Sequence, residues 1–541
     1  MPRARYTGEE TGNCYNGLVA THIKVLAAGG LIFLLGAAAY HTLDPDFGWR
    51  VRTGEWILQN QKLPTKDLFS FTMPDYPWID HAWLSSVLFA LAHRHVPPTL
   101  LSGIIALLVA FPFIWWIWRV QNVWERITVF IAGLSLLLFM GVRAQFFSLF
   151  LFFVCWLIIE YRRLRPGLMA LLPLLFFLWS MVHGGFVAGL FFLGLVFLID
   201  LYQWHRGEVH APELLLSGSS FILSSTATLV TPYGLRLAEE IAIIFFSREN
   251  ARFISEWQPL PNFFFDPLII TLTAVSILFT LRSWKTWTVE RSVPFYVFLA
   301  FALVSARNWY FFIIVALPIL TESMSALGEE IKNSKPSRHA KLFAGILVSV
   351  ALFVFIWGGG WWRVVSWRDR RLERYPYGAL ASLASLPPVD STRLFNEYAW
   401  GGWLIFHTPH LKTFIDGRMP YWEEKEHSVM RDYVDVILLE KKSLEELVRQ
   451  YDLNAALVPR RATSSPSWLE RSAKRIAKEL VSRDTVARLQ ERIERPLNFL
   501  RPKPQMNLTE EFQRLGWQVV YEDNIAVLLL APVQSETALP Q

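Results

Sequence analysis

Residues 25–54 read VLAAGGLIFLLGAAAYHTLDPDFGWRVRTG. Residues 25–40 carry no charge, and a polar segment with Asp44, Asp46 and Arg50 follows at once. Uncharged runs of this kind can cross the hydrocarbon core of a bilayer, which is about 30 Å thick. The stretch therefore predicts a membrane helix with two carboxylates at its exit.

The same apolar pattern repeats along the chain. The 541 residues are 53% hydrophobic and 15% aromatic, well above the usual share in soluble domains. The pattern predicts a polytopic α-helical membrane protein with about 11 transmembrane helices. We expect these helices to begin near residues 25, 99, 127, 145, 168, 186, 214, 265, 293, 309 and 342.

The charge distribution and the cysteine content argue against nucleic-acid binding and against a fold held by disulfides or cysteine-bound metal. The net charge of +6 is spread over short gaps between apolar runs, so nucleic acid is not an expected partner. The two cysteines, Cys14 and Cys155, cannot build a disulfide framework or a cysteine-based metal site.

The distribution of lysine and arginine predicts the orientation. Cation-rich gaps alternate with cation-poor gaps, and the positive-inside rule places the former in the cytoplasm. We predict a cytoplasmic N-terminus at residues 1–24 and a transmembrane domain at 25–357 in the cell membrane, with outer loops at about 44–98 and 231–264. A signal peptide cleaved after residues 37–39 is the alternative for the first run.

In the tail, residues 358–541, the long apolar runs give way to charged residues and to short strand-like and helical stretches. This pattern predicts a non-cytoplasmic α/β domain. Helical spacing of apolar residues predicts a helix over residues 467–495. Strand-like runs occupy residues 393–395, 413–415, 455–458 and 518–530.

The carboxylates of Asp44 and Asp46 admit two chemical interpretations and one structural one. Together they can bind a divalent cation such as Mg²⁺ or Mn²⁺, or one can act as a base while the other tunes its pKa. Alternatively, the first aspartate caps a helix that begins with Pro45. The residues alone leave the three possibilities open.

The segment from Asp44 to Thr53, DPDFGWRVRT, resembles the first outer-loop motif of the catalytic subunit of oligosaccharyltransferase. That subunit belongs to the GT-C superfamily of membrane glycosyltransferases. The resemblance implies a GT-C-like fold and places Asp44 on the catalytic carboxylate of the family. A second segment, ISEWQP at residues 254–259, is similar to the family's Ser-Glu-x-Gln-Pro element and implies that Glu256 contacts the acceptor.

Two departures from the family pattern bear on acceptor and metal. The segment containing Tyr398 and Trp400 is similar to the aromatic loop of the family's outer domain, but it lacks Trp-Trp-Asp-Tyr-Gly. We therefore expect a hydroxyl acceptor rather than an asparagine amide. Arg143 stands where the family has a second acidic pair, so a metal site made of Asp44 and Asp46 alone would have too few ligands unless Asp80, His81 or phosphate oxygens join them. Metal dependence is therefore open at this point.

Further polar residues lie at predicted outer helix junctions. Arg143 and Arg307 can hold phosphate oxygens through paired hydrogen bonds or extend to lipid head groups, and Arg307 resembles the family's phosphate-binding arginine. The segment with Trp78, Asp80 and His81 combines indoles for sugar stacking with groups for acid–base work.

These residues predict an inverting glycosyltransferase that uses a polyprenyl-(pyro)phosphate-linked sugar and a glycan, lipid or protein acceptor. A protein oligosaccharyltransferase proper is one alternative. A transporter or flippase of lipid-linked glycans is another, although the predicted spans hold few charges.

The predicted orientation can be tested with reporter fusions. We expect a reporter joined after Leu327 to be cytoplasmic and one joined after Pro388 to be outside, because an odd number of spans lies before the tail. Enzymatic reporters active in only one compartment make the measurement. A cytoplasmic tail would place it in a different compartment from Asp44.

Overall fold

The computed structural model describes most of the chain. The described residues are 8–42, 44–247, 250, 254–260, 267–283, 287–332, 374–388, 391–424, 427–438, 442–460 and 506–532. They form two compact units. The helical unit comprises Met1–Thr65 and Trp78–Arg371, and the sheet unit comprises Lys66–Pro77 and Leu372–Gln541. The boundary expected after residue 357 lies outside the described residues, as does the helix expected over 467–495.

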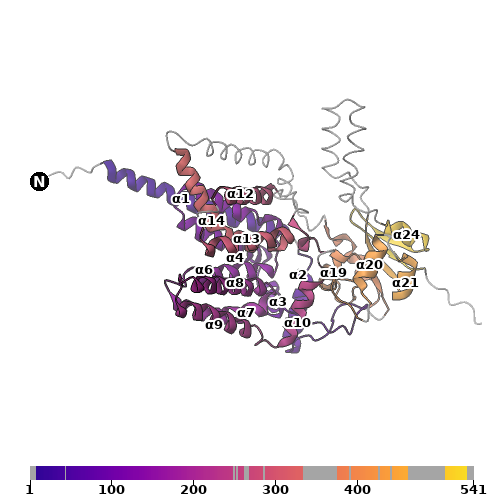
Figure 1. Ribbon diagram of the computed structural model, residues 1–541. Coiled ribbons are helices and arrows are strands. Elements are labelled where there is room, and N and C mark those ends of the chain that lie inside the picture. The colour runs from indigo at the N-terminus through magenta and orange to yellow at the C-terminus, as the bar shows by residue number, and fades with distance from the viewer. Residues whose placement is uncertain are drawn as a thin grey trace, which may run out of the picture. The chain divides into compact units, whose positions relative to one another are not determined.

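The described part of the helical unit is built from α-helices and short 3₁₀ turns, and α6 to α9 lie side by side in it (Figure 1). Its helices are α1 (Gly8–His41), α2 (Phe47–Asn60), α3 (Trp83–His95), α4 (Pro98–Arg119), α5 (Val123–Leu134), α6 (Gln145–Glu160), α7 (Leu172–Val182), α8 (Phe186–His205), α9 (Ala211–Ala227), α10 (Leu235–Phe246), α12 (Pro267–Ser283), α13 (Val289–Val304) and α14 (Trp309–Lys332). Its short turns include η3 (Ser255–Trp257) and η6 (Ala306–Asn308).

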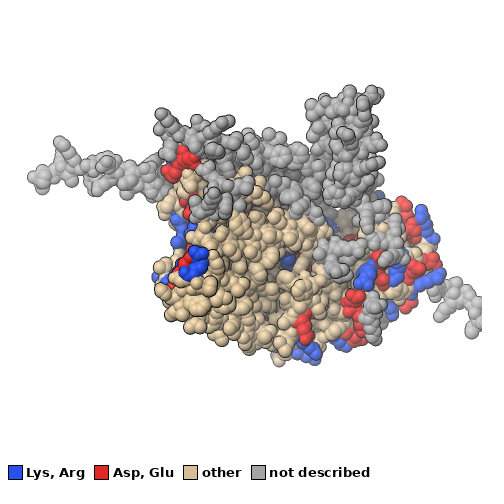
Figure 2. All heavy atoms as spheres, viewed as in Figure 1, with Lys and Arg blue, Asp and Glu red and all other residues tan. Residues whose placement is uncertain are grey.

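Among the described residues, four helices are long and apolar enough to cross a membrane. They are Thr21–His41, Pro98–Arg119, Phe186–His205 and Ala306–Lys332. Figure 2 shows a broad face of the helical unit almost without charged side chains, as lipid contact requires. The chain is a membrane protein. The total of about 11 transmembrane helices stays a prediction.

The predicted outer loop at residues 44–98 contains two packed helices, α2 and α3. The backbones of α2 and α3 come close together because α2 has a glycine where the two helices cross. A Cβ added to Gly54 would lie 2.0 Å from the carbonyl oxygen of Ser86. At the start of α2, the backbone N–H of Asp46 donates to Asp44 Oδ1 at 2.9 Å. These contacts give the residues after α1 a defined backbone.

The described part of the sheet unit contains a four-stranded sheet of order β1-β2-β4-β3. β1 pairs with β2 in parallel, and the other two pairs are antiparallel. The expected strand over 518–530 is a hairpin of two strands, whereas Thr413 forms only isolated bridges with Ser70 and Leu394. The elements are η8 (Tyr377–Ala379), α18 (Leu380–Ala384), β1 (Leu394–Asn396), η9 (Tyr398–Trp400), α19 (Gly401–His407), α20 (Val429–Ile437), α21 (Leu444–Tyr451), β2 (Ala455–Pro459), α24 (Leu508–Arg514), β3 (Gln518–Glu522) and β4 (Ala526–Leu530).

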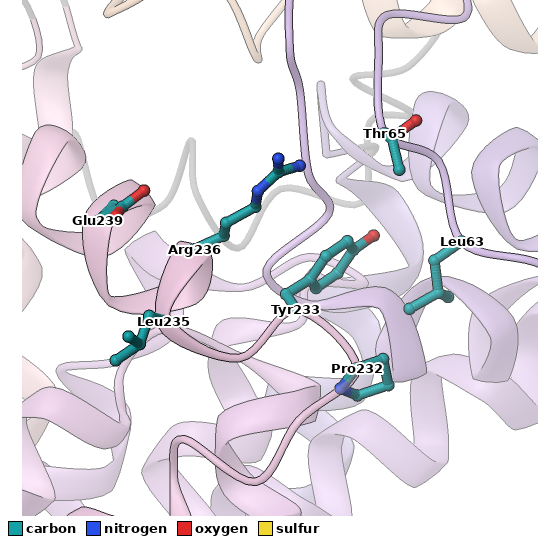
Figure 3. A pocket seen from close by; sticks show the side chains of 7 residues that line it. All are labelled: Leu63, Thr65, Pro232, Tyr233, Leu235, Arg236 and Glu239. Atoms are coloured by element: carbon teal, nitrogen blue, oxygen red, sulfur yellow. The ribbon is translucent and has the colours of Figure 1, made fainter.

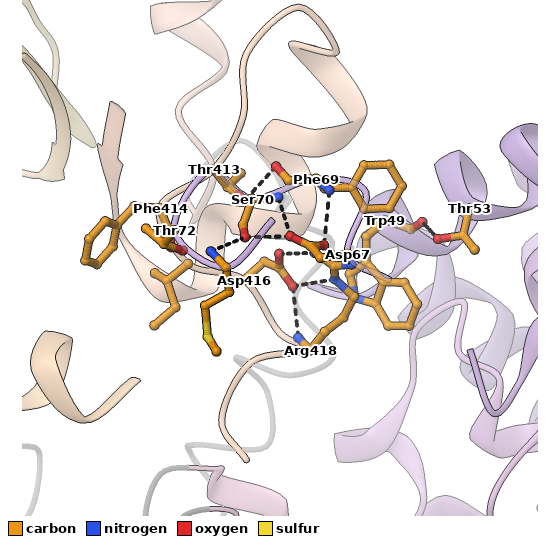
Figure 4. A network of polar contacts seen from close by, with 12 residues as sticks. Trp49, Thr53, Asp67, Phe69, Ser70, Thr72, Thr413, Phe414, Asp416 and Arg418 are labelled. Carbon is orange, nitrogen blue, oxygen red and sulfur yellow. Dashed lines mark hydrogen bonds and ion pairs between the residues drawn. The ribbon is translucent and has the colours of Figure 1, made fainter. Parts of the chain in front are cut away.

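A buried ion-pair network fixes residues 66–77 within the sheet unit (Figure 4). Arg418 Nη1 lies 2.8 Å from Asp67 Oδ1, and its Nη2 lies 2.6 Å from Asp416 Oδ2. Ser70 Oγ donates to Asp67 at 2.5 Å. Because one guanidinium serves two carboxylates, loss of Arg418 would leave two buried negative charges without their cation.

The close packing of α2 and α3 generates a stability prediction. We expect Gly54→Ala to lower the free energy of unfolding by about 1–3 kcal/mol, because the new methyl group overlaps a backbone atom that cannot move alone. Gly103→Ala is the matched control, since a Cβ on this α4 glycine meets nothing within 4 Å. Thermal unfolding of the detergent-purified protein makes the comparison, and equal melting temperatures would contradict it.

Candidate functional site

Three residues predicted from separate stretches of the sequence meet in the helical unit. Arg143 Nε forms an ion pair with Asp44 Oδ2, and Arg143 Nη1 forms another with Glu256 Oε1. Asp44 lies between α1 and α2, Arg143 precedes α6, and Glu256 belongs to η3. Only 7% of the Asp44 side chain is exposed, against 19% for Arg143. The guanidinium thus bridges two carboxylates, and its contact with phosphate stays a prediction.

The two carboxylates that share Arg143 differ in proton affinity. Burial raises the pKa of Asp44 to about 6 although Arg143 acts to lower it, and the negative charge of Asp46 adds to the rise. Burial also acts on Glu256, but Arg143 and Arg307 together hold its pKa below the usual value. Of the two, Asp44 is therefore the group able to exchange a proton near neutral pH.

The second carboxylate of the motif has a different partner. Asp46 is the N-cap residue of α2, and its Oδ1 accepts a hydrogen bond from Trp49 Nε1 at 3.0 Å. Asp44 Oδ1 accepts a hydrogen bond from the backbone N–H of Asp46, as the helix-capping interpretation predicts, although α2 itself begins at Phe47 with Asp46 as its N-cap residue. Within the described residues, no group of three histidine, cysteine or acidic side chains is placed to hold a metal ion.

A second polar group surrounds Arg307, which begins the last described apolar helix. Arg307 Nη2 lies 3.3 Å from His183 Nε2, and its guanidinium carbon lies 5.1 Å from the ring centre of Trp257. The other ring nitrogen of His183 contacts Ser148 Oγ at 2.7 Å. Burial, with Arg307 and His81 nearby, holds the pKa of His183 well below its usual value, so this imidazole is neutral.

The predicted segment with Asp80 and His81 extends this group. Arg50 Nη1 lies 3.7 Å from Asp80 Oδ1, and Ser86 donates to the other carboxylate oxygen at 2.5 Å. Burial and the charge of Arg50 lower the pKa of His81 to about 4, against the effect of Asp80. We call the charged Arg50 and Arg307, together with the neutral imidazoles of His81 and His183, the cationic cluster, because its two arginines give it a positive charge.

Sequence reasoning did not place Arg50 and His183 in the candidate site. Arg50 was visible as part of the DPDFGWRVRT motif, and His183 stood before Gly184 and Gly185 at a helix junction. The second glycine is required locally, because a Cβ on Gly185 would lie 2.4 Å from Ser148 Oγ and 3.0 Å from His183 Nδ1. A histidine followed by two glycines between apolar runs was the available signal.

The predicted aromatic contacts have packing roles in the described structure. Trp78 is 2% exposed and packs edge-on against Trp49 with ring centres 6.0 Å apart, so its faces are covered by protein rather than open to a sugar. Trp400, 5% exposed, donates from Nε1 to the Arg374 carbonyl oxygen at 2.8 Å within the sheet unit. Tyr398 is partly buried in the same unit.

A cavity of about 570 Å³ lies between the chain at Leu63 and Thr65 and the start of α10 (Figure 3). Tyr233 lines this cavity and contacts the first outer loop, because its hydroxyl donates to the Pro64 carbonyl oxygen at 3.1 Å and lies 3.4 Å from the backbone nitrogen of Asp80. The cavity is lined by Leu63, Thr65, Pro232, Tyr233, Leu235, Arg236 and Glu239.

Comparison with solved structures adds a likeness in fold. The chain resembles an archaeal oligosaccharyltransferase. The apo structure of the Archaeoglobus fulgidus enzyme has 12% sequence identity and a TM-score of 0.48, over 81% of this chain and 69% of that chain. The form tethered to an acceptor peptide has the same identity and coverage and a TM-score of 0.49. A complex of the oligosaccharyltransferase AglB from Archaeoglobus fulgidus with an inhibitory peptide and a dolichol-phosphate has 11% identity and a TM-score of 0.47, over 82% of this chain and 70% of that chain. No protein-family model and no curated protein sequence matches the chain.

The charge arrangement around Asp44 generates a titration prediction. We expect the Asp44 carboxyl to lose its proton with a midpoint near pH 6 and Arg143→Gln to raise that midpoint, because Arg143 stabilises the ionised form. Infrared difference spectra between acidic and neutral pH, with Asp44→Asn as reference, measure the protonated carboxyl band. A band that does not depend on Asp44 would contradict the assignment.

Proposed function

We propose that this chain is an inverting glycosyltransferase of the GT-C type. It transfers a sugar or oligosaccharide from a polyprenyl-(pyro)phosphate carrier to an acceptor at the outer face of the membrane. The observation that carries the proposal is a buried carboxyl with a raised pKa, Asp44, next to a cluster of arginines and neutral histidines at the ends of apolar helices. A base beside an anion-binding group is the combination that transfer from a phosphate carrier requires.

The cationic cluster suits the leaving group. A polyprenyl tail is apolar and lies in the bilayer, while its phosphate is an anion that arginine binds through two hydrogen bonds. Arg307 links the cationic cluster to the carboxylates that share Arg143, because it contacts His183 and also lowers the pKa of Glu256. In the proposed reaction it offsets the charge that develops on the phosphate oxygen as the glycosidic bond breaks.

Asp44 serves as the general base. The acceptor hydroxyl gives its proton to the Asp44 carboxylate, its oxygen forms a bond to the anomeric carbon, and the electron pair of the broken bond leaves with the carrier phosphate. A single displacement of this kind inverts the anomeric centre. The pKa of about 6 suits a base at neutral pH, because the group is largely ionised and still accepts a proton.

Glu256 positions the acceptor, and the cavity beside Tyr233 is the candidate acceptor groove. The groove presents both Arg236 and Glu239, so it suits an acceptor with several hydroxyl groups that donate and accept hydrogen bonds. Tyr398 and Trp400 remain predicted acceptor contacts of the sheet unit.

The proposal is tested at Asp44. We expect Asp44→Asn to lower transfer by about 10²–10⁴-fold while the protein stays folded, because the amide keeps the shape of the carboxylate but accepts no proton near neutral pH. Lipid-linked sugars and surface glycans extracted from a strain that carries only the variant provide the measurement. The accumulated donor and the truncated glycan would also identify both substrates.

Asp200→Asn is the matched control for this substitution. Asp200 is also a buried aspartate paired with an arginine, Arg162, at 3.0 Å, but the pair joins the ends of α6 and α8 away from the site residues. Its substitution should leave transfer intact. If Asp44→Asn still builds the glycan at the rate of this control, Asp44 is not the base and the proposed function loses its main support.

A further inference from the structure

The contact between Asp44, Arg143 and Glu256 has the geometry of a bridged carboxylate pair. One carboxylate oxygen from each acid lies against a separate nitrogen of the same guanidinium. The acids are 212 positions apart in the chain by their residue numbers, 256 minus 44, and without a cation between them they would repel one another. A positive charge between the two carboxylates is therefore needed to hold them in this arrangement.

A divalent cation is the usual solution where carboxylates from different loops converge, but the donors here do not fit one. Mg²⁺ and Mn²⁺ sites need several oxygen ligands. Asp46 accepts a hydrogen bond from Trp49, and the remaining Asp44 oxygen accepts one from the Asp46 backbone. Among the described residues these acids and histidines form no three-membered ligand group.

The backbone around both acids is held independently of Arg143. Ser305 Oγ donates to the Glu256 carbonyl oxygen at 3.3 Å, and the Ala306 backbone N–H donates to the Gln258 carbonyl oxygen at 3.0 Å, which joins η3 to η6. The turn between Asp44 and Asp46 fixes the other acid. Removal of the arginine therefore leaves the two carboxylates near each other with the space between them open.

We propose that the guanidinium of Arg143 is the built-in cation of this site, in the place between Asp44 and Glu256 that a divalent metal would otherwise occupy, and that the site works without metal. A guanidinium stays charged and carries its donors in a rigid plane, so it orients two carboxylates as a bridging ion does. A metal ion bound to the same oxygens would have to displace it. The inference deepens the proposed function and rests on it only for the activity measurement below.

Manganese binding tests the placement of the cation directly. The full-length protein is purified in detergent, freed of metal with a chelator and titrated with Mn²⁺, and free Mn²⁺ is followed by electron paramagnetic resonance. We expect the wild type to show no Mn²⁺ site that depends on Asp44. Arg143→Asp should gain one Mn²⁺ per chain with at least about tenfold higher affinity, because three carboxylates then converge.

Two further variants keep the test decisive. Arg143→Ala gives the smaller gain expected from two carboxylates and serves if Arg143→Asp does not fold. Arg162→Gln removes the arginine of the other buried pair, with Asp200, and should gain nothing. The inference is overturned if the wild type binds one Mn²⁺ that Asp44→Asn or Glu256→Gln abolishes, or if neither Arg143 variant binds more Mn²⁺ than the Arg162→Gln control.

The activity measurement separates the inference from the proposed function. Wild-type transfer in vesicles should change less than about twofold when EDTA is added, whereas a loss that Mn²⁺ or Mg²⁺ restores would overturn the inference. If the wild type transfers no sugar with or without metal, the proposed function fails, and the manganese titration still decides where the cation lies.

Discussion

The candidate site depends on the sharing of one guanidinium between two carboxylates. A buried charge is stable only when it is paired, and removal of one partner leaves the other with the full cost of desolvation. Arg143 joins Asp44, which follows the first apolar helix, to Glu256, which precedes α12, and so it connects distant parts of the helical unit. The difference in pKa between the two carboxylates matters as much as the pairing. Glu256 has a second arginine nearby while Asp44 has a second acid, and this asymmetry leaves Asp44 as the proton-accepting member.

In the sheet unit an arginine also bridges two carboxylates, but there the bridge stabilises the fold. Arg418 lies between Asp67 and Asp416 with all three side chains almost fully buried, whereas Arg143 and Glu256 each keep about a fifth of their side-chain surface exposed. Burial to this extent indicates a structural connection, here between residues 66–77 and the rest of the sheet unit. The partial exposure of Arg143 and Glu256 leaves them accessible to a ligand, and this difference separates the two arginine-centred networks.

The helices that carry the site were predictable because each apolar run is long and bounded by charge. Described helices begin near nine of the expected positions, and the position near residue 25 lies inside α1, which begins at Gly8. The helix α2 corresponds to the alternative in which a helix follows Asp44, although it begins at Phe47, whereas α3 was not expected. Asp44, Glu256, Arg143 and Arg307 were recognised from local motifs and from charges at helix ends. Their pairing was not, because nothing in a linear sequence indicates that Arg143 lies against a residue 113 positions away.

The aromatic residues singled out in the sequence show that composition alone does not distinguish a packing role from a binding role. Trp78 stood next to polar groups and suggested sugar stacking, and Trp400 stood in the segment similar to the family's aromatic loop. Each indole is buried against its own unit. An indole has a large apolar surface, and burial of that surface stabilises a fold whether or not a ligand is present. Buried ionisable groups are more informative, because their burial costs free energy that packing alone does not recover. Of the residues singled out in the first outer loop, the charged side chains of Asp44, Arg50 and Asp80 therefore identify the site more securely than the tryptophans beside them.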